Sequence, residues 1–222
     1  MASSFPTTPR SQVKRVRERG THEKEIIARI LDEGLIAHVG FQTEGQPFVI
    51  TMAYARRGDS LLLHGSVGSR LMRQLGGGIP ACVTVTLLDG LVLARSAFHH
   101  SMNYRSVVAF GTARRIVGEA EKRRALDALV EHLVPGRTQD ARRPNDPELT
   151  GTEVLEMPLD EATAKVRTGP PKDEPEDMDL PIWAGVIPLR QQVGAALPDP
   201  EMLPGRETPD YVVHYRRPGA TD

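Results

Sequence analysis

The sequence predicts a mainly β protein of the α+β class, arranged as a closed or nearly closed antiparallel barrel. About seven or eight short apolar stretches follow one another, and tight turns separate most of them, which is typical of such barrels. The chain lacks both a regular strand–helix–strand rhythm and the GxGxxG turn of a dinucleotide-binding domain. These observations argue against a Rossmann fold.

The first half of the chain predicts one helix followed by a meander of strands. Ile26 and Ile30 fall on one face of a helix over residues 21–33, and Gly34 ends it. The Asp89-Gly90 pair predicts a hairpin turn between two later strands. The strands expected in this half cover residues 35–41, 48–54, 61–64, 81–88 and 91–95.

The second half predicts a long helix, further strands and two irregular segments. Four apolar residues recur at helical spacing over residues 119–134, and Pro135 ends that helix. Residues 137–150 and 170–179 are polar and contain prolines, so we expect a loop and an exposed flap. The strands expected in this half cover residues 105–117, with a bend at Gly111, and residues 154–158, 163–167 and 183–189.

These elements divide the chain into three predicted parts. Residues 1–20 carry several arginines and no apolar run, so we expect a flexible basic arm. Residues 21–190 contain the strands and helices of the barrel domain. Residues 191–222 are rich in proline, so we expect an extended tail.

Composition limits the class of function. A formal net charge of −1 provides no overall field that would favour nucleic acid or an anionic membrane. The single cysteine, Cys82, cannot form an intramolecular disulfide and fits a reducing cytosol. No run approaches the roughly 20 apolar residues of a membrane span. The sequence therefore predicts a cytoplasmic protein that binds neither nucleic acid nor membrane.

One stretch combines a strand, a turn and the start of a short helix in the pattern of an anion site. The predicted strand ends at His64, and Gly65 begins a turn of small residues that ends at Ser69. Glycines allow close backbone approach, the serines supply hydroxyls, and Arg70 supplies a planar fork suited to phosphate. The same residues also suit an ordinary turn in which Ser69 caps the helix.

Three further stretches carry more polar or aromatic groups than a strand edge needs. Arg105 and Ser106 begin a strand and are candidates for the same phosphate as Arg70. Lys165 and Arg167 are two apart on a strand, so both can face one ligand, although a solvated edge pair has the same spacing. The third is Trp183, beside Gly185, which can offer a flat wall to a planar ring or belong to the core.

Two adjacent histidines, His99 and His100, are the candidate proton donors. Imidazole titrates near neutral pH, but a solvated hairpin end would contain the same residues. Adjacent residues on a strand point to opposite faces, so the pair cannot share a metal, and we expect no metal site. A single axial histidine to haem stays open. The sequence offers no GxSxG nucleophile.

Four motifs in order resemble the pyridoxamine 5'-phosphate oxidase-like family, and most closely its flavin-binding branch with the nitroimidazole-resistance reductases. They are HGSVGSRL (64–71), LDGLVLARSAFHHSMNYRSVV (88–108), AKVRTGPP (164–171) and WAGVIPL (183–189). The resemblance implies a six-stranded antiparallel split β-barrel with flanking helices. It also implies a homodimer with FMN at the interface.

The same resemblance implies particular binding roles. The strand at residues 49–52 would run along the flavin ring, and the turn and helix start at residues 64–71 would hold the FMN phosphate with Arg105 and Ser106. Lys165, Arg167 and Trp183 would lie where the partner subunit closes the site. The cofactor-binding residues implied are Val49, Ile50, Thr51, Met52, His64, Gly65, Ser69, Arg70, Leu71, Arg105, Ser106, Lys165, Arg167 and Trp183.

The function expected is an FMN-dependent oxidoreductase acting on a small organic substrate, for example by nitro- or quinone-type reduction, with a nicotinamide as possible electron donor. Some branches of the family use haem or a deazaflavin in the same groove. A flavin or haem carrier or sensor without turnover is therefore the alternative. The basic stretch at residues 211–217 lacks the spacing with which the oxidase proper grips pyridoxal phosphate, which argues against vitamin B6 oxidation.

Overall fold

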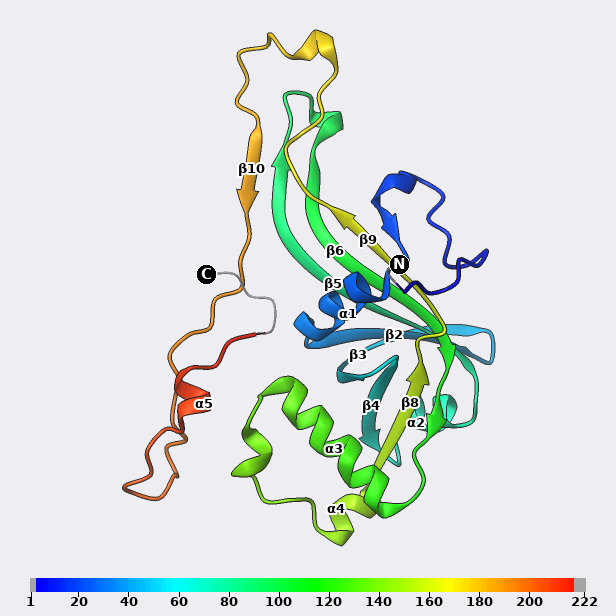
Figure 1. Ribbon diagram of the computed structural model, residues 1–222, viewed down its shortest axis with the longest axis vertical. Coiled ribbons are helices and arrows are strands. Elements are labelled where there is room, and N and C mark those ends of the chain that lie inside the picture. Colours follow the sequence, from blue (N-terminus) through cyan, green and yellow to red (C-terminus); the bar gives the residue numbers. More distant parts are fainter. Residues whose placement is uncertain (1–2, 218–222) are drawn as a thin grey trace.

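A computed structural model describes residues 3–217 of the chain. Ten strands form one antiparallel sheet in the order β1-β9-β6-β5-β2-β3-β4-β8-β7, with β10 paired to β5 (Figure 1). The mainly antiparallel prediction is confirmed, but the sheet is not closed. The strands are β1 (Gly20–Thr21), β2 (Ile36–Thr43), β3 (Gln46–Arg57), β4 (Ser60–Ser66), β5 (Pro80–Leu93), β6 (Ser101–Thr112), β7 (Arg114–Arg115), β8 (Thr152–Pro158), β9 (Glu161–Arg167) and β10 (Gly185–Pro188). The helices are α1 (Lys24–Glu33), α2 (Arg70–Gly76), α3 (Glu119–Leu133), α4 (Asp146–Gly151) and α5 (Asp210–Val213).

The main core lies on the inner face of the curled sheet, where α1 packs. Along β5 the odd-numbered residues Val83 and Val85 are buried and the even-numbered Thr84 and Thr86 are not, which is the period-2 pattern of a half-buried strand. Ile27 and Ile30 of α1 are almost fully buried against this face. Burial of each such side chain stabilises the fold by about 1.5–3 kcal/mol. A second, smaller cluster forms where α3 covers the outer face of β4 and β8.

The predicted hairpin at Asp89-Gly90 is wrong. β5 runs straight through this pair, with a bulge between Leu88 and Gly90, and stays paired with β6 on both sides of it. A Cβ atom on Gly90 would come within 2.9 Å of the Ile187 carbonyl oxygen, so glycine is needed for close approach of β10 rather than for a turn. The chain reverses later, through a short 3₁₀ segment at Ala97–His99.

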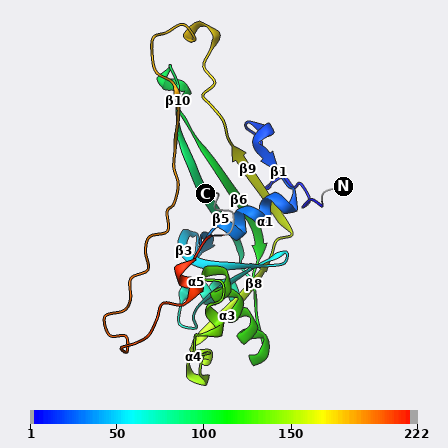
Figure 2. The same ribbon diagram turned by 60° about the vertical axis from the view of Figure 1, so that its left-hand side comes forward.

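The upper ends of β5 and β6, with β10 and the segment between β9 and β10, form a projection that we call the arm (Figures 1 and 2). The Asp173 carboxylate fastens this segment to the end of β5, because it accepts hydrogen bonds from the Arg95 N–H at 2.8 Å and the Ser96 N–H at 3.3 Å. Burial raises the pKa of Asp173, but these hydrogen bonds and the Arg95 guanidinium outweigh it and hold the pKa below its usual value. The expected flap is therefore anchored at its start.

The described N-terminal residues are docked on the sheet, whereas the sequence predicted a free basic arm. Phe5 belongs to the buried core, and Ser11 is buried. Thr8 and Arg10 both bind the carboxylate of Glu161 in β9. Of the basic residues of this segment, Arg10 thus has a structural partner, while the division of the chain at residue 20 stays a prediction.

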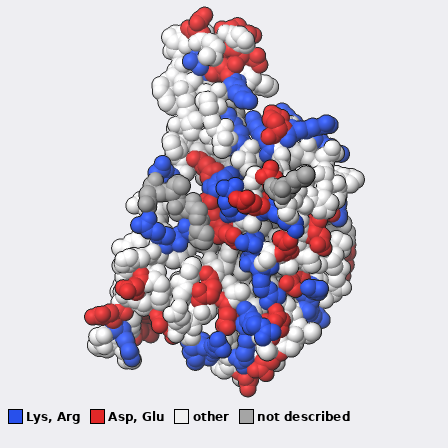
Figure 3. Space-filling view, viewed as in Figure 1, with Lys and Arg blue, Asp and Glu red and all other residues white. Residues whose placement is uncertain are grey.

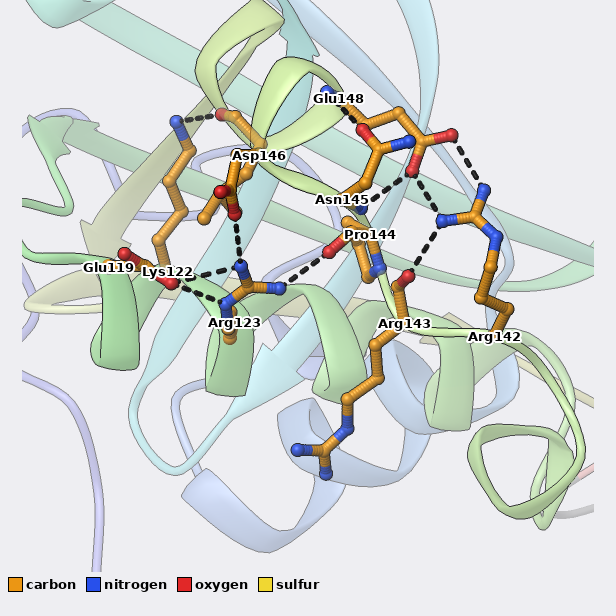
Figure 4. A network of polar contacts seen from close by, with 10 residues as sticks. Glu119, Lys122, Arg123, Arg142, Arg143, Pro144, Asn145, Asp146 and Glu148 are labelled. Carbon is orange, nitrogen blue, oxygen red and sulfur yellow. Dashed lines mark hydrogen bonds and ion pairs between the residues drawn. The ribbon is translucent and has the colours of Figure 1, made fainter.

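The segment expected as a loop at residues 137–150 contains α4 and is fixed to α3 (Figure 4). Asn145 and Glu148 form a reciprocal capping box at the start of α4. Arg123 of α3 donates to the Pro144 carbonyl at 2.6 Å, and Lys122 donates to the Leu149 carbonyl at 2.6 Å. These contacts hold the segment against α3, so it is a structural part of the fold and not the irregular loop that the sequence predicted.

Side chains from three distant elements cap the C-terminal end of α1. Tyr54 of β3 donates to the Leu31 carbonyl at 2.6 Å, and His132 of α3 bonds the carbonyl of Gly34 at 2.8 Å. Arg217, in the tail, donates to the carbonyl of Glu33. The last carbonyls of a helix have no partner within the helix, so these contacts stabilise the end of α1 and tie the tail to it.

Candidate functional site

The most open part of the sheet is the point where β3 leaves β4. β3 pairs with β2 from Gln46 to Ala53, but pairs with β4 only from Tyr54 to Arg57. β4 pairs with β8 on its other edge along its whole length, from Ser60 to Ser66, so beyond Leu63 it follows β8 and leaves β3, and the sheet splits. Within the described residues, the outer edge of β3 over residues 46–53 has no ladder partner. Its backbone N–H and C=O groups are free to bind the polar edge of a ring.

Side chains on both faces of this stretch of β3 are exposed, which is unusual for a strand inside a sheet. Val49 is 68% exposed and Ile50 is 41% exposed, while Thr51 is exposed and Met52 partly so. These four residues are the ones predicted to run along the flavin ring. The structure places them together at one free edge, and their role in binding a cofactor stays a prediction.

Arg70 lies beside this edge. Its guanidinium carbon is 5.2 Å from the centroid of the Phe48 ring, and within residues 3–217 it makes no hydrogen bond or ion pair. Ser69 is the residue before α2, but its hydroxyl makes no capping hydrogen bond, so the plain capping alternative fails. Among the described residues, neither the Arg70 guanidinium nor the Ser69 hydroxyl therefore has a hydrogen-bond partner. Phe48 was missed, because nothing in the sequence distinguishes this aromatic residue from a core one.

Gly65 and Leu71 serve packing in this turn. A Cβ atom on Gly65 would lie 2.9 Å from Cγ of Met72, so the turn and α2 are pressed together. Leu71 is buried in the main core, with 6% of its surface exposed. Leu71 can therefore meet a ligand only through its backbone, and its predicted place in the phosphate-binding helix start stays a prediction.

His64 lies where β3 and β4 separate, and its environment favours a neutral ring. The residue is half-buried, and its Nδ1 has no hydrogen-bond partner among the described residues. Burial lowers the pKa of His64 below its ordinary value. A neutral imidazole is the form that binds a metal ion such as haem iron.

Strand register places three predicted residues on one face. Leu63 of β4 pairs with Tyr54 of β3, so the next residue of β4, His64, lies beside Ala53 of β3. Ala53 in turn pairs with Ile36 of β2. On the far side of the sheet, Ser106 lies between Thr86 and Lys165. These residues all have the parity of the outer face. The outer face therefore carries His64, Ala53, Ile36, Thr86, Ser106 and Lys165 in approximate sequence across the strands.

Arg105 does not join Arg70 within one chain, and this corrects the predicted clamp. It faces the opposite side of β6 from Ser106, where its guanidinium binds the carboxylate of Asp89 at 2.8 and 2.9 Å and also that of Glu33. These carboxylates raise its pKa. The hydroxyl of Ser106 donates to the Lys165 carbonyl at 3.4 Å. Within one chain Arg105 is thus paired with two carboxylates, and its predicted role in binding a phosphate stays a prediction.

The histidines and the tryptophan lie on the arm, far from β3 of the same chain. His99 faces Glu174 at 3.6 Å, and His100 contacts the carbonyl of Ser96 at 3.1 Å. His38 of β2 pairs with Thr84 of β5, which pairs with Val108 of β6. Ser101, at the start of β6, is seven residues from Val108, or roughly 20 Å along the strand. Trp183 is 66% exposed, so it is not a core residue. A catalytic role for the histidines would need a second chain.

Arg167 serves the base of the arm. It is buried, donates to the Gly169 carbonyl at 3.0 Å and the Pro170 carbonyl at 3.1 Å, and also binds Asn103. Lys165, two residues earlier, has no hydrogen bond or ion pair among the described residues. The two residues therefore differ as candidate ligand-binding groups. The Arg167 guanidinium is already hydrogen-bonded within its own chain, whereas the Lys165 ammonium has no described partner.

Within residues 3–217, no group of three or more His, Cys, Asp or Glu side chains is placed to hold a metal ion. No described helix is both long and apolar enough to cross a membrane. Figure 3 shows acidic groups at the tip of the arm, a largely uncharged shaft below it and mixed charges over the centre of this face.

An antiparallel sheet that splits between β3 and β4 and leaves an open strand edge is the architecture of a split β-barrel protein. Residues 23–166 match the sequence profile of the family described as pyridoxamine 5'-phosphate oxidase. The chain belongs to this flavin-binding family, as the sequence motifs predicted.

Solved structures agree with this assignment. The flavocytochrome Anf3 from Azotobacter vinelandii is 41% identical over 94% of this chain and 97% of its own, with a TM-score of 0.90. A FAD and heme binding protein from Mycobacterium smegmatis is 39% identical over 87% of this chain and 95% of its own, with a TM-score of 0.84. A candidate 5-nitroimidazole antibiotic resistance protein from Bacteroides thetaiotaomicron is 27% identical over 66% of this chain and 86% of its own, with a TM-score of 0.54. No curated protein matches the sequence.

Proposed function

We propose that this chain is a redox protein that binds both a flavin and a haem. The observation that carries the proposal is the arrangement at the split: β3 has a free edge with Arg70 beside it at Phe48, and His64 lies where β3 and β4 separate, with a buried Nδ1 that has no described partner. The two relatives at 41% and 39% identity are named for flavin with haem or cytochrome character, which supports the same pair of cofactors.

The flavin end of the proposal uses residues 49–52, Ser69 and Arg70. Free backbone groups at the β3 edge would bind the polar edge of the ring, and Arg70 with Ser69 would bind a phosphate. A bound flavin supplies hydride and one-electron chemistry, while the protein fixes its position and excludes water. FMN, predicted from the sequence, and FAD, named for the Mycobacterium relative, share the ring and one phosphate, so these residues suit either.

The haem end uses His64. Burial keeps its imidazole neutral, and the neutral ring is the one that can act as an axial ligand. Ile36, which is 54% exposed and lies in the same cross-strand row as His64, offers an apolar side chain that suits the flat surface of a porphyrin. If the protein bound a deazaflavin and no haem, His64 would have no role as an axial ligand.

We further propose that the working unit is a homodimer. The arm exposes large apolar side chains far beyond the body of one chain, including Phe98 at 87% and Trp183 at 66%. Contact with a second copy would remove this surface from water. It would also bring Trp183 and His99 of one chain towards the open edge of the other, where a small organic substrate can meet the flavin.

The absorption spectrum of the purified protein tests the proposal. We expect flavin bands together with a Soret band, and chromatography of the released flavin separates FMN from FAD. His64→Ala should abolish the Soret band and keep the flavin, whereas the matched variant His38→Ala, on the same face, should keep both. A protein that binds neither cofactor on titration would refute the proposal.

An alternative is a carrier or sensor without turnover, which the family also accommodates. Reduction kinetics separate it from an oxidoreductase. We expect NADH, NADPH or a chemical donor to reduce the bound flavin, and the haem spectrum to follow within the same experiment. Reduction of the flavin without electron transfer to haem, or to nitro or quinone compounds, would favour the carrier.

A further inference from the structure

The N-terminal segment presents a group of cations that the chain itself does not neutralise. Residues 14–19, which we call the basic loop, have an excess of three positive charges, from Lys14, Arg15, Arg17 and Arg19 against Glu18. Within residues 3–217 none of these five side chains makes a hydrogen bond or ion pair. All are exposed except Arg19, which is half-buried. The basic loop is therefore available to an acidic partner.

The backbone of the basic loop has a fixed and strained shape. Val16 adopts left-handed dihedral angles, with φ 55° and ψ 59°, which are unfavourable for a β-branched residue. The Arg19 N–H donates to the Val16 carbonyl at 3.1 Å. A Cβ atom on Gly20 would lie 2.7 Å from Cγ2 of Val13, so the two ends of the loop are pressed together. The cations thus project from a preformed turn.

The opposite charge gathers at the arm tip, residues 172–180, as Figure 3 shows. Arg95 holds Asp173, as described above. The remaining charges of the tip have an excess of three negative charges, from Glu174, Glu176, Asp177 and Asp179 against Lys172. Only the first of these four acids has a described partner, His99 at 3.6 Å. The arm tip therefore matches the basic loop in the size of its charge and is opposite in sign.

Apolar surface accompanies both patches. Met178 and Leu180, between the acids of the arm tip, are 53% and 42% exposed. Beside the basic loop, a cavity of about 870 Å³ opens between this loop and α1, and Ile26, Ile30 and Val166 are among its lining residues. The acidic and basic residues of that lining are nearly equal in number, so the cavity adds apolar contact rather than charge.

The two patches do not meet within one chain. The N-terminal segment lies beside β9 and well below the arm tip in both views (Figures 1 and 2). No described hydrogen bond or ion pair joins residues 14–19 to residues 172–180. In a dimer with two-fold symmetry, a contact between two different patches occurs twice, once in each direction. A second copy of this chain therefore supplies the complement of both patches at once.

We infer that the arm tip of one copy docks on the basic loop of a second copy. This inference rests on the proposed homodimer and adds the surfaces through which the two copies meet. Single exposed ion pairs contribute little affinity, but complementary patches fix orientation and exclude wrong pairings. The contact would therefore set the direction in which the arm of one copy crosses the other.

Charge reversal, followed by sedimentation equilibrium of the full chain, tests the inference. Lys14→Glu with Arg17→Glu reverses the basic loop, and Glu176→Arg with Asp179→Arg reverses the arm tip. We expect each double variant to raise the dissociation constant of the dimer about tenfold or more, because like charges then face each other at two contacts. The fourfold variant should recover most of the lost affinity, because opposite charges face each other again.

The controls change charge at exposed positions of the tail. Arg206→Glu and Glu207→Arg should each dimerise as wild type does. If a double variant does not fold, the salt dependence of the wild-type dimer still tests the inference. We expect its dissociation constant to rise between 50 and 500 mM NaCl, because salt screens exposed charges. A dissociation constant that does not change with salt would contradict the inference.

The outcomes separate this inference from the rest of the proposed function. A wild-type protein that stays monomeric would overturn both the homodimer and the inference, and would leave the cofactor proposal to its own spectral test. A wild-type dimer that neither reversal weakens would overturn only the inference, as would a fourfold variant that recovers no affinity. Heparin binding that Lys14→Glu with Arg17→Glu abolishes, while the dimer stays intact, would assign the basic loop to a polyanion instead.

Discussion

Arg70 and Arg105 were both predicted to bind one phosphate, and the structure gives them opposite situations. Arg70 is exposed, touches only the ring of Phe48 among the described residues and stands beside a free strand edge. Arg105 is enclosed by Glu33 and Asp89 and joins the end of α1 to β5 and β6. An arginine in a motif is available to a ligand only when the fold leaves its guanidinium without acidic partners. The first of these arginines suits binding and the second suits stability.

The largest expected effect is on the Arg105 side. Arg105→Ala leaves two carboxylates facing each other in a partly buried site, so we expect a loss of about 2–3 kcal/mol in the free energy of unfolding. Urea denaturation measures it. Arg114→Ala removes an arginine that is 71% exposed and should change stability by less than about 0.5 kcal/mol. Equal losses in the two variants would remove the distinction.

Arg70→Ala should show the reverse pattern. We expect flavin affinity to fall tenfold or more, since a charge-assisted hydrogen bond contributes about 1.5–3 kcal/mol. Stability should stay within about 0.5 kcal/mol of wild type. Flavin fluorescence titration measures the affinity, and Arg73→Ala, one turn later on α2, is the control. Unchanged affinity in Arg70→Ala would place the phosphate elsewhere.

The α1 end near Arg105 also predicts a pH dependence. Burial lowers the pKa of His132 in the folded protein, so the unfolded chain takes up the proton first as pH falls below about 6.5. Stability is then full above that pH, and the contribution of this residue is lost as pH is lowered towards 5. Burial also lowers the pKa of His64, but His64 is present in both wild type and the His132→Gln variant described next, so it affects the two proteins equally.

His132→Gln can still donate to the Gly34 carbonyl but does not titrate. We expect its free energy of unfolding to fall less steeply between pH 7 and 5 than that of wild type. Parallel pH profiles for the two proteins would show that His132 is not the group responsible.

The smallest effect expected is at the tail. Tyr215→Phe removes the hydrogen bond of 2.8 Å from the hydroxyl to the Leu133 carbonyl and should cost about 0.5–1 kcal/mol. Flavin affinity should not change, because this hydrogen bond joins the tail to the end of α3 and involves none of the residues proposed to bind the flavin. Tyr211→Phe, whose hydroxyl accepts from Arg137 at an exposed site, should cost less. A change in flavin affinity in Tyr215→Phe would link the tail to the flavin end.

Local pattern predicted most of the strands but failed where a residue pair has two uses. Asp89-Gly90 is a hairpin signal only if the chain turns there, and here it forms a bulge that lets β10 approach. Nothing nearby in the sequence announces β10, which is almost 100 residues later. The same limit applies to Arg105, because its partner Glu33 lies on a helix 72 residues away.

The sequence by itself determined the antiparallel class, the strand alternation and the turn that contains His64, Ser69 and Arg70, since these depend on short-range periodicity and residue chemistry. The tertiary structure decided which of the predicted polar residues are available. Register put His64, Ser106 and Lys165 on one outer face and turned Arg105 to the other. Side-chain direction has a period of two along a strand, so only the pairing of distant strands could fix which residues share a face.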